Sequence, residues 1–309
     1  MESLQQIQAR RKSVRNIGTI TKAMELVAAT KMRRSQTIAV ASRPYAATAL
    51  ELLKRLRREE LSYTSPLLEA RAIKNRLVVL VTSDKGLAGA FNSNVLKSFE
   101  NFLKDNDVLK MSFISVGLRS HDYMSRNNLP EAATFAHYGD YTTVSEIAPL
   151  SQLILDGYLT HQWDEVVIFS THFINALKQK VLEQKILPID LKSLEKTIEE
   201  ILPTHGRFSP ETVRVKQTEK AQEYLIEPSA ETVLEQLLPH ILTMQIYHIM
   251  LEANASEHSA RRLAMQSASD NASELNDELT LIYNKSRQAT ITREIIEISS
   301  GAESLKIQN

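Results

Sequence analysis

AETVLEQLLPHILTMQIYHIMLEANASEHSARRLAMQSASDNASELNDELTLIYNKSRQATITREIIEISS, residues 230–300, decides the fold, because it contains one proline, Pro239, and no glycine. Residues 3–58 form a second such stretch, in which Gly18 is the one glycine and Pro44 the one proline. Continuous helices here would be roughly 100 Å and 80 Å long, whereas a compact domain of this length has a radius of gyration near ~20 Å. The sequence therefore predicts two long terminal helices with a globular domain between them.

The two terminal stretches carry opposite charge. Residues 1–58 hold 13 Lys and Arg against three acidic residues, and residues 227–305 hold five against 12. The formal net charge of the whole chain is zero. Because opposite charges offset one another when helices lie side by side, we expect the two stretches to pair. A solvated face on each helix would explain the charges but not the lengths.

The first stretch carries a thin apolar stripe with spacings of three and four residues. A self-associating zipper would need Leu or Ile at nearly every position, so we expect a partner helix that contributes small residues. The second stretch supplies them at residues 253–256 and 267–269. We expect antiparallel pairing, with residues near Val27 beside residues near Leu275. The stripe consists of Leu4, Ile7, Val14, Ile17, Met24 and Ala28, with Arg11 and Thr21 as interruptions.

Between the terminal stretches, strand patterns alternate with helix patterns. This alternation predicts a small, mostly parallel, Rossmann-like α/β sheet. Periodicity leaves open whether residues 171–227 add a strand or hairpin. Short β-branched or aromatic runs predict strands at residues 77–82, 111–116, 133–138 and 165–170, and helical patterns occupy residues 94–103 and 144–160.

The predicted organisation has four parts. They are an N-terminal helix at residues 1–58, the α/β domain at 75–227, a C-terminal helix at 228–300 and a frayed tail at 301–309. Ser229 is the expected N-cap of the second helix, Pro239 should kink this helix, and Gly301 should stop it.

The composition excludes several kinds of site. Zero cysteines exclude disulfides and thiolate metal sites. The apolar runs are far shorter than the ~18 residues that a spanning helix needs, so we expect no direct insertion into a membrane. The polar, basic N-terminus predicts no secretory signal.

The run SerAspLysGlyLeuAlaGly at residues 83–89 lies between a predicted strand and a predicted helix, where phosphate-binding loops occur. It has only two glycines, Gly86 and Gly89, and no Gly-Lys-Ser/Thr follows. It therefore matches neither the phosphate loop nor the dinucleotide fingerprint, and we interpret it as a structural turn. The eight histidines include no His-x3-His pair, so we expect no metal site and no cofactor. No pattern of catalytic residues occurs, and we expect none.

The basic run ThrLysMetArgArgSer at residues 30–35 is the strongest functional signal in the first stretch. It fits a solvated helix face, contact with acidic loops of a partner protein, or contact with nucleic-acid phosphates. It contains no aromatic residue, which disfavours binding to single-stranded nucleic acid.

The chain resembles the γ subunit of F-type ATP synthases. IGTITKAMELVAATKMRRSQ (17–36), followed by ASRPYA (41–46), and YNKSRQATITREIIEISSGAESL (283–305) are similar to that family's two signature regions. SDKGLAGAFN (83–92) and ASEHSARRLAMQSASDNA (255–272) also fit. The similarity runs in the same order along nearly the whole chain.

This resemblance implies a non-catalytic rotor shaft of a rotary ATP synthase driven by protons or sodium ions. The terminal helices would form a long antiparallel, left-handed coiled coil inside a hexamer of α and β subunits. The Rossmann-like α/β domain would contact the ε subunit and the c ring, and rotation would change the conformations of the catalytic β subunits. The resemblance also implies a peripheral location at the cytoplasmic face of the bacterial plasma membrane, with no cofactor, metal or nucleic acid bound.

Several residues acquire expected roles from the resemblance. Met24, Lys31, Arg33 and Arg34 would face acidic loops of β, Arg287, Gln288 and Thr292 would meet a catch loop of β, and Ile291, Ile295 and Ile298 would form an apolar bearing. Two alternatives stay open. A nucleotide-dependent enzyme would need phosphate-binding or catalytic residues that the sequence lacks. A coiled-coil nucleic-acid-binding or scaffold protein would leave the basic stretch unpaired.

Overall fold

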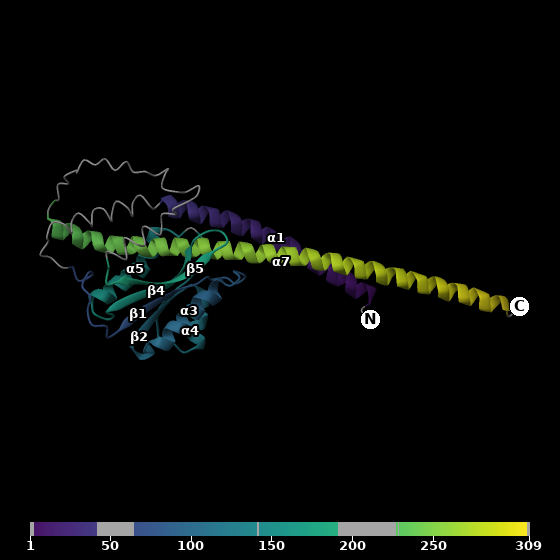
Figure 1. The fold of residues 1–309 in the computed structure, drawn as a ribbon, viewed down its shortest axis with the longest axis horizontal. Helices are drawn as coiled ribbons and strands as arrows, with labels where there is room; N and C mark the ends of the chain where they lie inside the picture. The colour runs from purple at the N-terminus through teal and green to yellow at the C-terminus, as the bar shows by residue number, and fades with distance from the viewer. Residues whose placement is uncertain (1–2, 42–64, 141, 191–226, 228, 308–309) are drawn as a thin grey trace. The chain divides into compact units, whose positions relative to one another are not determined.

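The computed structural model describes residues 3–41, 65–140, 142–190, 227 and 229–307 (Figure 1). The chain divides into two compact units. Residues 1–28 and 261–309 form the first, here called the coiled-coil unit, and residues 29–260 form the second, the α/β unit. Helices α1 (Leu4–Ala41) and α7 (Ala230–Ile307) contribute to both units. The predicted end of the first helix, at residue 58, lies outside the described residues.

The α/β unit contains a five-stranded sheet with the order β3-β2-β1-β4-β5. The first four strands are parallel, and β5 pairs antiparallel with β4 at the edge. The mostly parallel sheet is therefore confirmed, and β5 is the strand that periodicity left open. The strands are β1 (Arg76–Val81), β2 (Met111–Val116), β3 (Glu131–Phe135), β4 (Glu165–Phe173) and β5 (Gln179–Leu187).

Helices cover both faces of this sheet. Alternate residues of β1 point to opposite faces, so Val78 and Leu80 join one core while Leu77, Val79 and Val81 join the other. Helices α3 (Phe91–Asp105) and α4 (Leu118–Arg126) bury Val95, Phe99 and Met124 in the first core. Helices α5 (Val144–Leu159) and α7 cover the second core. A short 3₁₀ helix (Val108–Lys110) precedes β2. Helix α4 was not among the helices predicted from the sequence.

The first part of α7 belongs to the α/β unit. Leu238, Leu242 and Leu251 are fully buried in the same core as α5. The helix predicted at residues 228–300 is present, but its first part, residues 230–260, forms one layer of the α/β unit. The apolar residues of β1 require cover on both faces, and this part of α7 provides it.

Helix α7 begins where the sequence predicted, but it does not end at the predicted residue. The Ser229 Oγ accepts a hydrogen bond from the Thr232 N–H at 3.3 Å, which confirms the N-cap. The helix continues through Pro239 and Gly301 to Ile307, so the predicted stop at Gly301 and the frayed tail are wrong. A glycine inside a helix costs only about 1 kcal/mol, and the residues after it favour helix.

The coiled-coil unit contains a seven-residue repeat. In α1 the buried residues are Ile7, Val14, Thr21 and Ala28, and in α7 they are Met265, Ala272 and Leu279. A strict seven-residue repeat favours a left-handed supercoil. The expected stripe was partly wrong, because Ile17 is 52% exposed, whereas Thr21, taken as an interruption, is buried.

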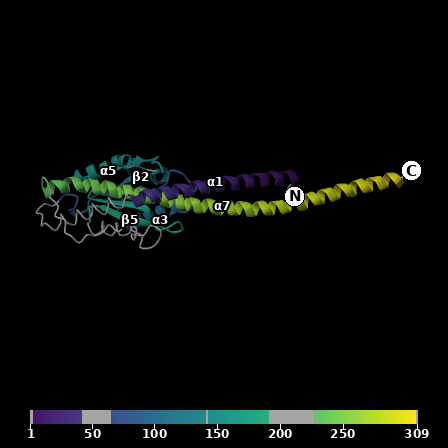
Figure 2. The same ribbon diagram turned by 90° about the horizontal axis from the view of Figure 1, so that it is seen from above.

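The contacts between the two helices show antiparallel order. Val14 packs against Ala272, Leu275 and Leu279, and the Arg11 guanidinium lies 4.9 Å from the centre of the Tyr283 ring. Figure 2 shows the start of α1 beside α7. The expected pairing of Val27 with Leu275 is wrong, since Val14 occupies that position and Val27 lies roughly 20 Å further along α1.

Gly18 is the point of close approach that the small residues were expected to allow. A Cβ atom added at Gly18 would lie 3.4 Å from the Ala272 Cβ. Disulfides join Cβ atoms about 3.5–4.5 Å apart. We therefore expect Gly18→Cys with Ala272→Cys to form a disulfide within one chain on oxidation, detected by mobility on a non-reducing gel.

The chain has no native cysteine, so the introduced pair has no competing thiol. The matched control is Val27→Cys with Leu275→Cys, which should stay reduced. A disulfide in the control and none in the first pair would contradict the register described here.

Candidate partner-contact surfaces

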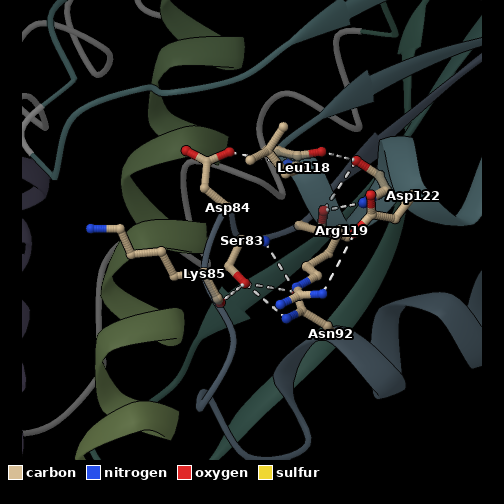
Figure 3. Close-up of polar contacts among 10 residues, drawn as sticks. Ser83, Asp84, Lys85, Asn92, Leu118, Arg119 and Asp122 are labelled. Atoms are coloured by element: carbon tan, nitrogen blue, oxygen red, sulfur yellow. Dashed lines mark hydrogen bonds and ion pairs between the residues drawn. The ribbon is translucent and has the colours of Figure 1, made fainter.

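The loop after β1, Ser83–Gly89, lies where doubly wound α/β folds bind phosphates, and the carboxylate of its Asp84 bonds to the start of α4 (Figure 3). The Asp84 Oδ1 accepts a hydrogen bond from the Leu118 N–H, at the start of α4, at 3.0 Å. The Asp84 Oδ2 accepts another from the His137 N–H at 2.9 Å. A helix N-terminus attracts anions, and here Asp84 supplies the anion. These contacts support the interpretation of a structural turn.

Other contacts close the same loop. The Ser83 N–H donates to the Asn92 side chain at 3.0 Å, and the Ser83 Oγ donates to the Lys85 carbonyl at 2.7 Å (Figure 3). The turn before α4 needs glycine, because Gly117 has a φ of +96° and an added Cβ would lie 2.2 Å from the Thr82 carbonyl oxygen. The loops after β1 and β2 therefore pack closely at this point.

Replacing Asp84 with alanine should destabilise the α/β unit by about 1–2 kcal/mol, since two backbone N–H groups lose their acceptor. Urea unfolding of the full chain measures this change. Asp122→Ala is the matched control, because Asp122 forms a solvent-exposed ion pair with Arg119 in α4 (Figure 3). Equal stability losses in the two variants would contradict the capping role of Asp84.

Glu252 of α7 is a buried carboxylate held by two histidines. The His172 Nδ1, from β4, lies 2.6 Å from the Glu252 Oε2, and the His248 Nε2 lies 3.0 Å from the Oε1. Burial would raise the pKa of Glu252, but the hydrogen bonds and charges of His172 and His248 outweigh it and lower the pKa to about 2. Among the described residues, no group of three or more His, Cys, Asp and Glu could hold a metal ion.

The lowered pKa of Glu252 predicts a loss of stability in acid. A carboxylate whose pKa is lowered on folding contributes stability above its unfolded pKa, and this contribution disappears as the pH falls towards its folded pKa. Between pH 5 and pH 3 the wild-type chain should lose about 2 kcal/mol of unfolding free energy more than Glu252→Gln does. Urea unfolding over a pH series measures the difference.

The control for this experiment is Glu274→Gln, which removes an exposed carboxylate from the same helix. Its pH dependence should match that of the wild-type chain. If Glu252→Gln also followed the wild-type curve, the two histidines would not be stabilising the ionised form of Glu252.

The basic run of α1 divides between the surface and the interior. Arg33 and Arg34 are exposed, whereas Met32 between them and Lys31 is buried. The Lys31 Nζ lies 2.5 Å from the Asp140 Oδ2 of the same chain. Met24 is half-buried. Within this run, the two arginines thus form the exposed basic surface, while Lys31 bonds within the chain.

The end of α7 extends beyond the start of α1. Arg11 contacts Tyr283, so the antiparallel order brings Leu4 level with residues near 290, and α7 continues to Ile307 (Figure 2). All ten side chains from Ile291 to Ser300 are exposed.

Four isoleucines dominate this exposed end. Ile291 is 45% exposed, Ile295 61%, Ile296 58% and Ile298 73%. A concentration of exposed apolar side chains on a single helix marks an interaction surface. Arg287, Gln288 and Thr292 are exposed on the same segment. Ile296 was absent from the expected bearing.

None of the helices in the described residues is both long and apolar enough to cross a membrane. The residues that sequence reasoning missed are acids inside the α/β unit: Asp84 as a helix cap, Asp140 and Glu252. Their spacing carries no motif, because their partners come from distant parts of the chain.

The comparisons with known proteins agree with one another. The family model described as ATP synthase matches residues 3–305. The ATP synthase gamma chain of Roseiflexus castenholzii is 38% identical over 309 residues, covering 99% of both chains. That of Geotalea daltonii is 39% identical over 308 residues, covering 99% of this chain and all of the relative. This chain belongs to the ATP synthase gamma chain family.

Solved structures show the same fold. A chain of the Euglena gracilis mitochondrial ATP synthase, in an OSCP/F1/c-ring structure, matches with a TM-score of 0.65 at 19% identity, covering 98% of this chain and 94% of that chain. A chain of the central stalk and c-ring structure from Tetrahymena thermophila matches with a TM-score of 0.57 at 23% identity, covering 81% and 99%. The combination of a coiled coil and an α/β domain is therefore confirmed. The alternative of a nucleic-acid-binding or scaffold protein gains no support from these comparisons.

Proposed function

We propose that this chain is the non-catalytic central-stalk rotor of a rotary ATP synthase, which couples rotation of the c ring to conformational changes in the catalytic β subunits. The observation that carries the proposal is the exposed end of α7, whose four isoleucines lie beyond the start of α1. Such a surface suits a sleeve of partner subunits. Membership in the gamma chain family supports the α and β subunits as that sleeve.

The end of α7 has the properties of a bearing. Ile291, Ile295 and Ile298 follow a four-and-three spacing and so share one helix face. Apolar contacts are non-directional, so they allow a helix to turn without fixing its angle. Arg287 and Gln288 lie just before this face and can form directional hydrogen bonds with a loop of β. The isoleucine face would therefore allow the helix to turn, and Arg287 with Gln288 would bind a loop of β at a defined angle.

The exposed basic surface of α1 suits transient contact with acidic loops of β. Arg33 and Arg34 are exposed, and Met24 lies half-buried two to three turns earlier. Exposed ion pairs contribute only about 0–1 kcal/mol each, so they can form and break as the rotor turns. Lys31 is the weakest member of this set, because its ammonium already bonds to Asp140.

The α/β unit would contact the ε subunit and the c ring, with protons or sodium ions as the coupling ion. The complex would place the chain, as a peripheral subunit, at the cytoplasmic face of the bacterial plasma membrane. The Asp84 contacts support a structural role for the loop after β1, because they tie this loop to the start of α4 and to His137.

Co-expression with the other subunits tests the proposed function. The chain should co-purify with α and β in the proportions of one rotor per α/β hexamer, and the complex should couple ATP hydrolysis to ion pumping. A chain that folds but never joins this complex would contradict the proposal.

Arg287→Ala combined with Gln288→Ala should lower coupled ATP synthesis about tenfold, the effect of losing a charge-assisted hydrogen bond. Deletion of residues 302–309 is the comparison, since it leaves the four isoleucines Ile291, Ile295, Ile296 and Ile298 in place and should preserve synthesis. Reconstituted complexes in vesicles measure both rates. Loss of synthesis in the truncation and none in the double variant would rule out the latch at these two residues.

A further inference from the structure

One carboxylate of the α/β unit bonds to both long helices. Asp140 lies in the connection between β3 and α5. Its Oδ2 is 2.5 Å from the Lys31 Nζ of α1, and its Oδ1 is 3.0 Å from the His258 Nε2 of α7. Each oxygen therefore serves a different helix.

The same connection makes a second contact with each helix. The Ser35 Oγ of α1 donates to the Asp140 carbonyl at 3.4 Å. The Asn254 Nδ2 of α7 donates to the Thr142 Oγ1 at 3.3 Å. Lys31 and Ser35 are four residues apart, as are Asn254 and His258, so each helix presents one face to the connection. Two contacts on one face restrict rotation of a helix about its axis better than one contact does.

The surroundings favour an ionised Asp140. Burial would raise its pKa, but the hydrogen bond from Lys31 and the charges of His258, Lys31 and Lys85 outweigh burial and lower the pKa. His258 is 5% exposed and Asp140 35%, so the pair is partly shielded from water. Shielding strengthens a charge-assisted hydrogen bond relative to one at the open surface.

The position of these contacts in the chain gives them mechanical importance. Lys31 and His258 lie two residues inside Ala29 and Ala260, the first and last residues of the α/β unit. Apolar packing also holds the helices in this unit, with Met32 buried on α1 and Leu251 on α7. Packing resists separation but is non-directional, so it fixes the rotation of a helix less firmly than hydrogen bonds do.

We propose that Asp140 is a positioning residue that locks α1 and α7 to the α/β unit at the point where both helices leave it, so that rotation of the unit turns both helices together. This inference rests on the proposed rotor function. It also gives Lys31 a role inside the chain, separate from any contact with β.

The assembled complex in ion-tight vesicles tests this inference. Asp140→Asn keeps the size of the side chain and removes its charge. ATP hydrolysis should stay near the wild-type rate, while ions pumped per ATP should fall at least about threefold, since α1 and α7 are held less firmly to the unit. Asp140→Glu, which restores the charge, should restore most of the pumping. Asp122→Asn is the matched control and should behave as wild type.

A double-mutant cycle separates the inner role of Lys31 from contact with a partner. If Lys31 acts through Asp140, then Lys31→Met added to Asp140→Asn should lower the pumping ratio no further. Additive losses would contradict the lock. If Asp140→Asn prevents assembly, His258→Leu serves in its place, because His258 is too buried to contact a partner. Full coupling in an assembled His258→Leu complex, or failure of both variants to assemble, would overturn the inference.

The wild-type complex distinguishes this inference from the proposed function. If the wild-type chain does not support coupled pumping, the rotor function fails. If the wild-type chain pumps and an assembled Asp140→Asn complex pumps equally well, only the role of Asp140 fails.

Discussion

The organisation of the α/β unit depends on one strand that is buried on both faces. Leu77 to Val81 of β1 are each at most 2% exposed, so the sheet needs helices on both sides. Helices α3 and α4 cover one side, and α5 with the first part of α7 covers the other. A helix that already serves as a layer of the α/β unit then continues into the coiled-coil unit. Burial of β1 therefore explains why α7 needs its unusual length.

Carboxylates add direction to these apolar contacts. Asp84 fixes the start of α4, Asp140 bonds to α1 and α7, and Glu252 joins α7 to β4. Each acid meets N–H donors from elements that lie far apart in the sequence. A carboxylate away from water is stable only where such donors reach it, so each acid specifies one relative placement of its partners. Apolar burial therefore stabilises the α/β unit, and the hydrogen bonds of the three acids fix how its elements are oriented.

The features that the sequence revealed are those with a strong local signal. β2 was predicted at its observed bounds, because a β-branched or aromatic run buried on both faces differs sharply from its surroundings. β5 was left open because this edge strand carries exposed polar residues, and α4 was missed because it is short and polar. The coiled-coil register was wrong because Gly18 and Thr21, which lie in the seam, are not apolar in the ordinary sense.

Among the candidate surfaces, too, those with a local sequence signal could be predicted. The end of α7 could be identified through its resemblance to a family and through its isoleucine spacing. Asp140 and Glu252 could not, because nothing near Asp140 in the sequence indicates Lys31 or His258 as a partner. Contacts over such separations depend on the topology of the sheet, which local patterns do not encode.

The exposed end of α7 also has a consequence for the energetics of assembly. A helix without tertiary contacts gains little from propensity alone, because isolated helices of this length are marginal in water. Residues 291–300 bury little surface within the described chain, since every side chain there is exposed. Part of the free energy of binding to a sleeve must therefore offset the conformational entropy lost when this helical segment is held rigidly. The affinity for the sleeve should therefore depend on the helix propensity of residues in this segment, including residues that do not contact the partner subunits.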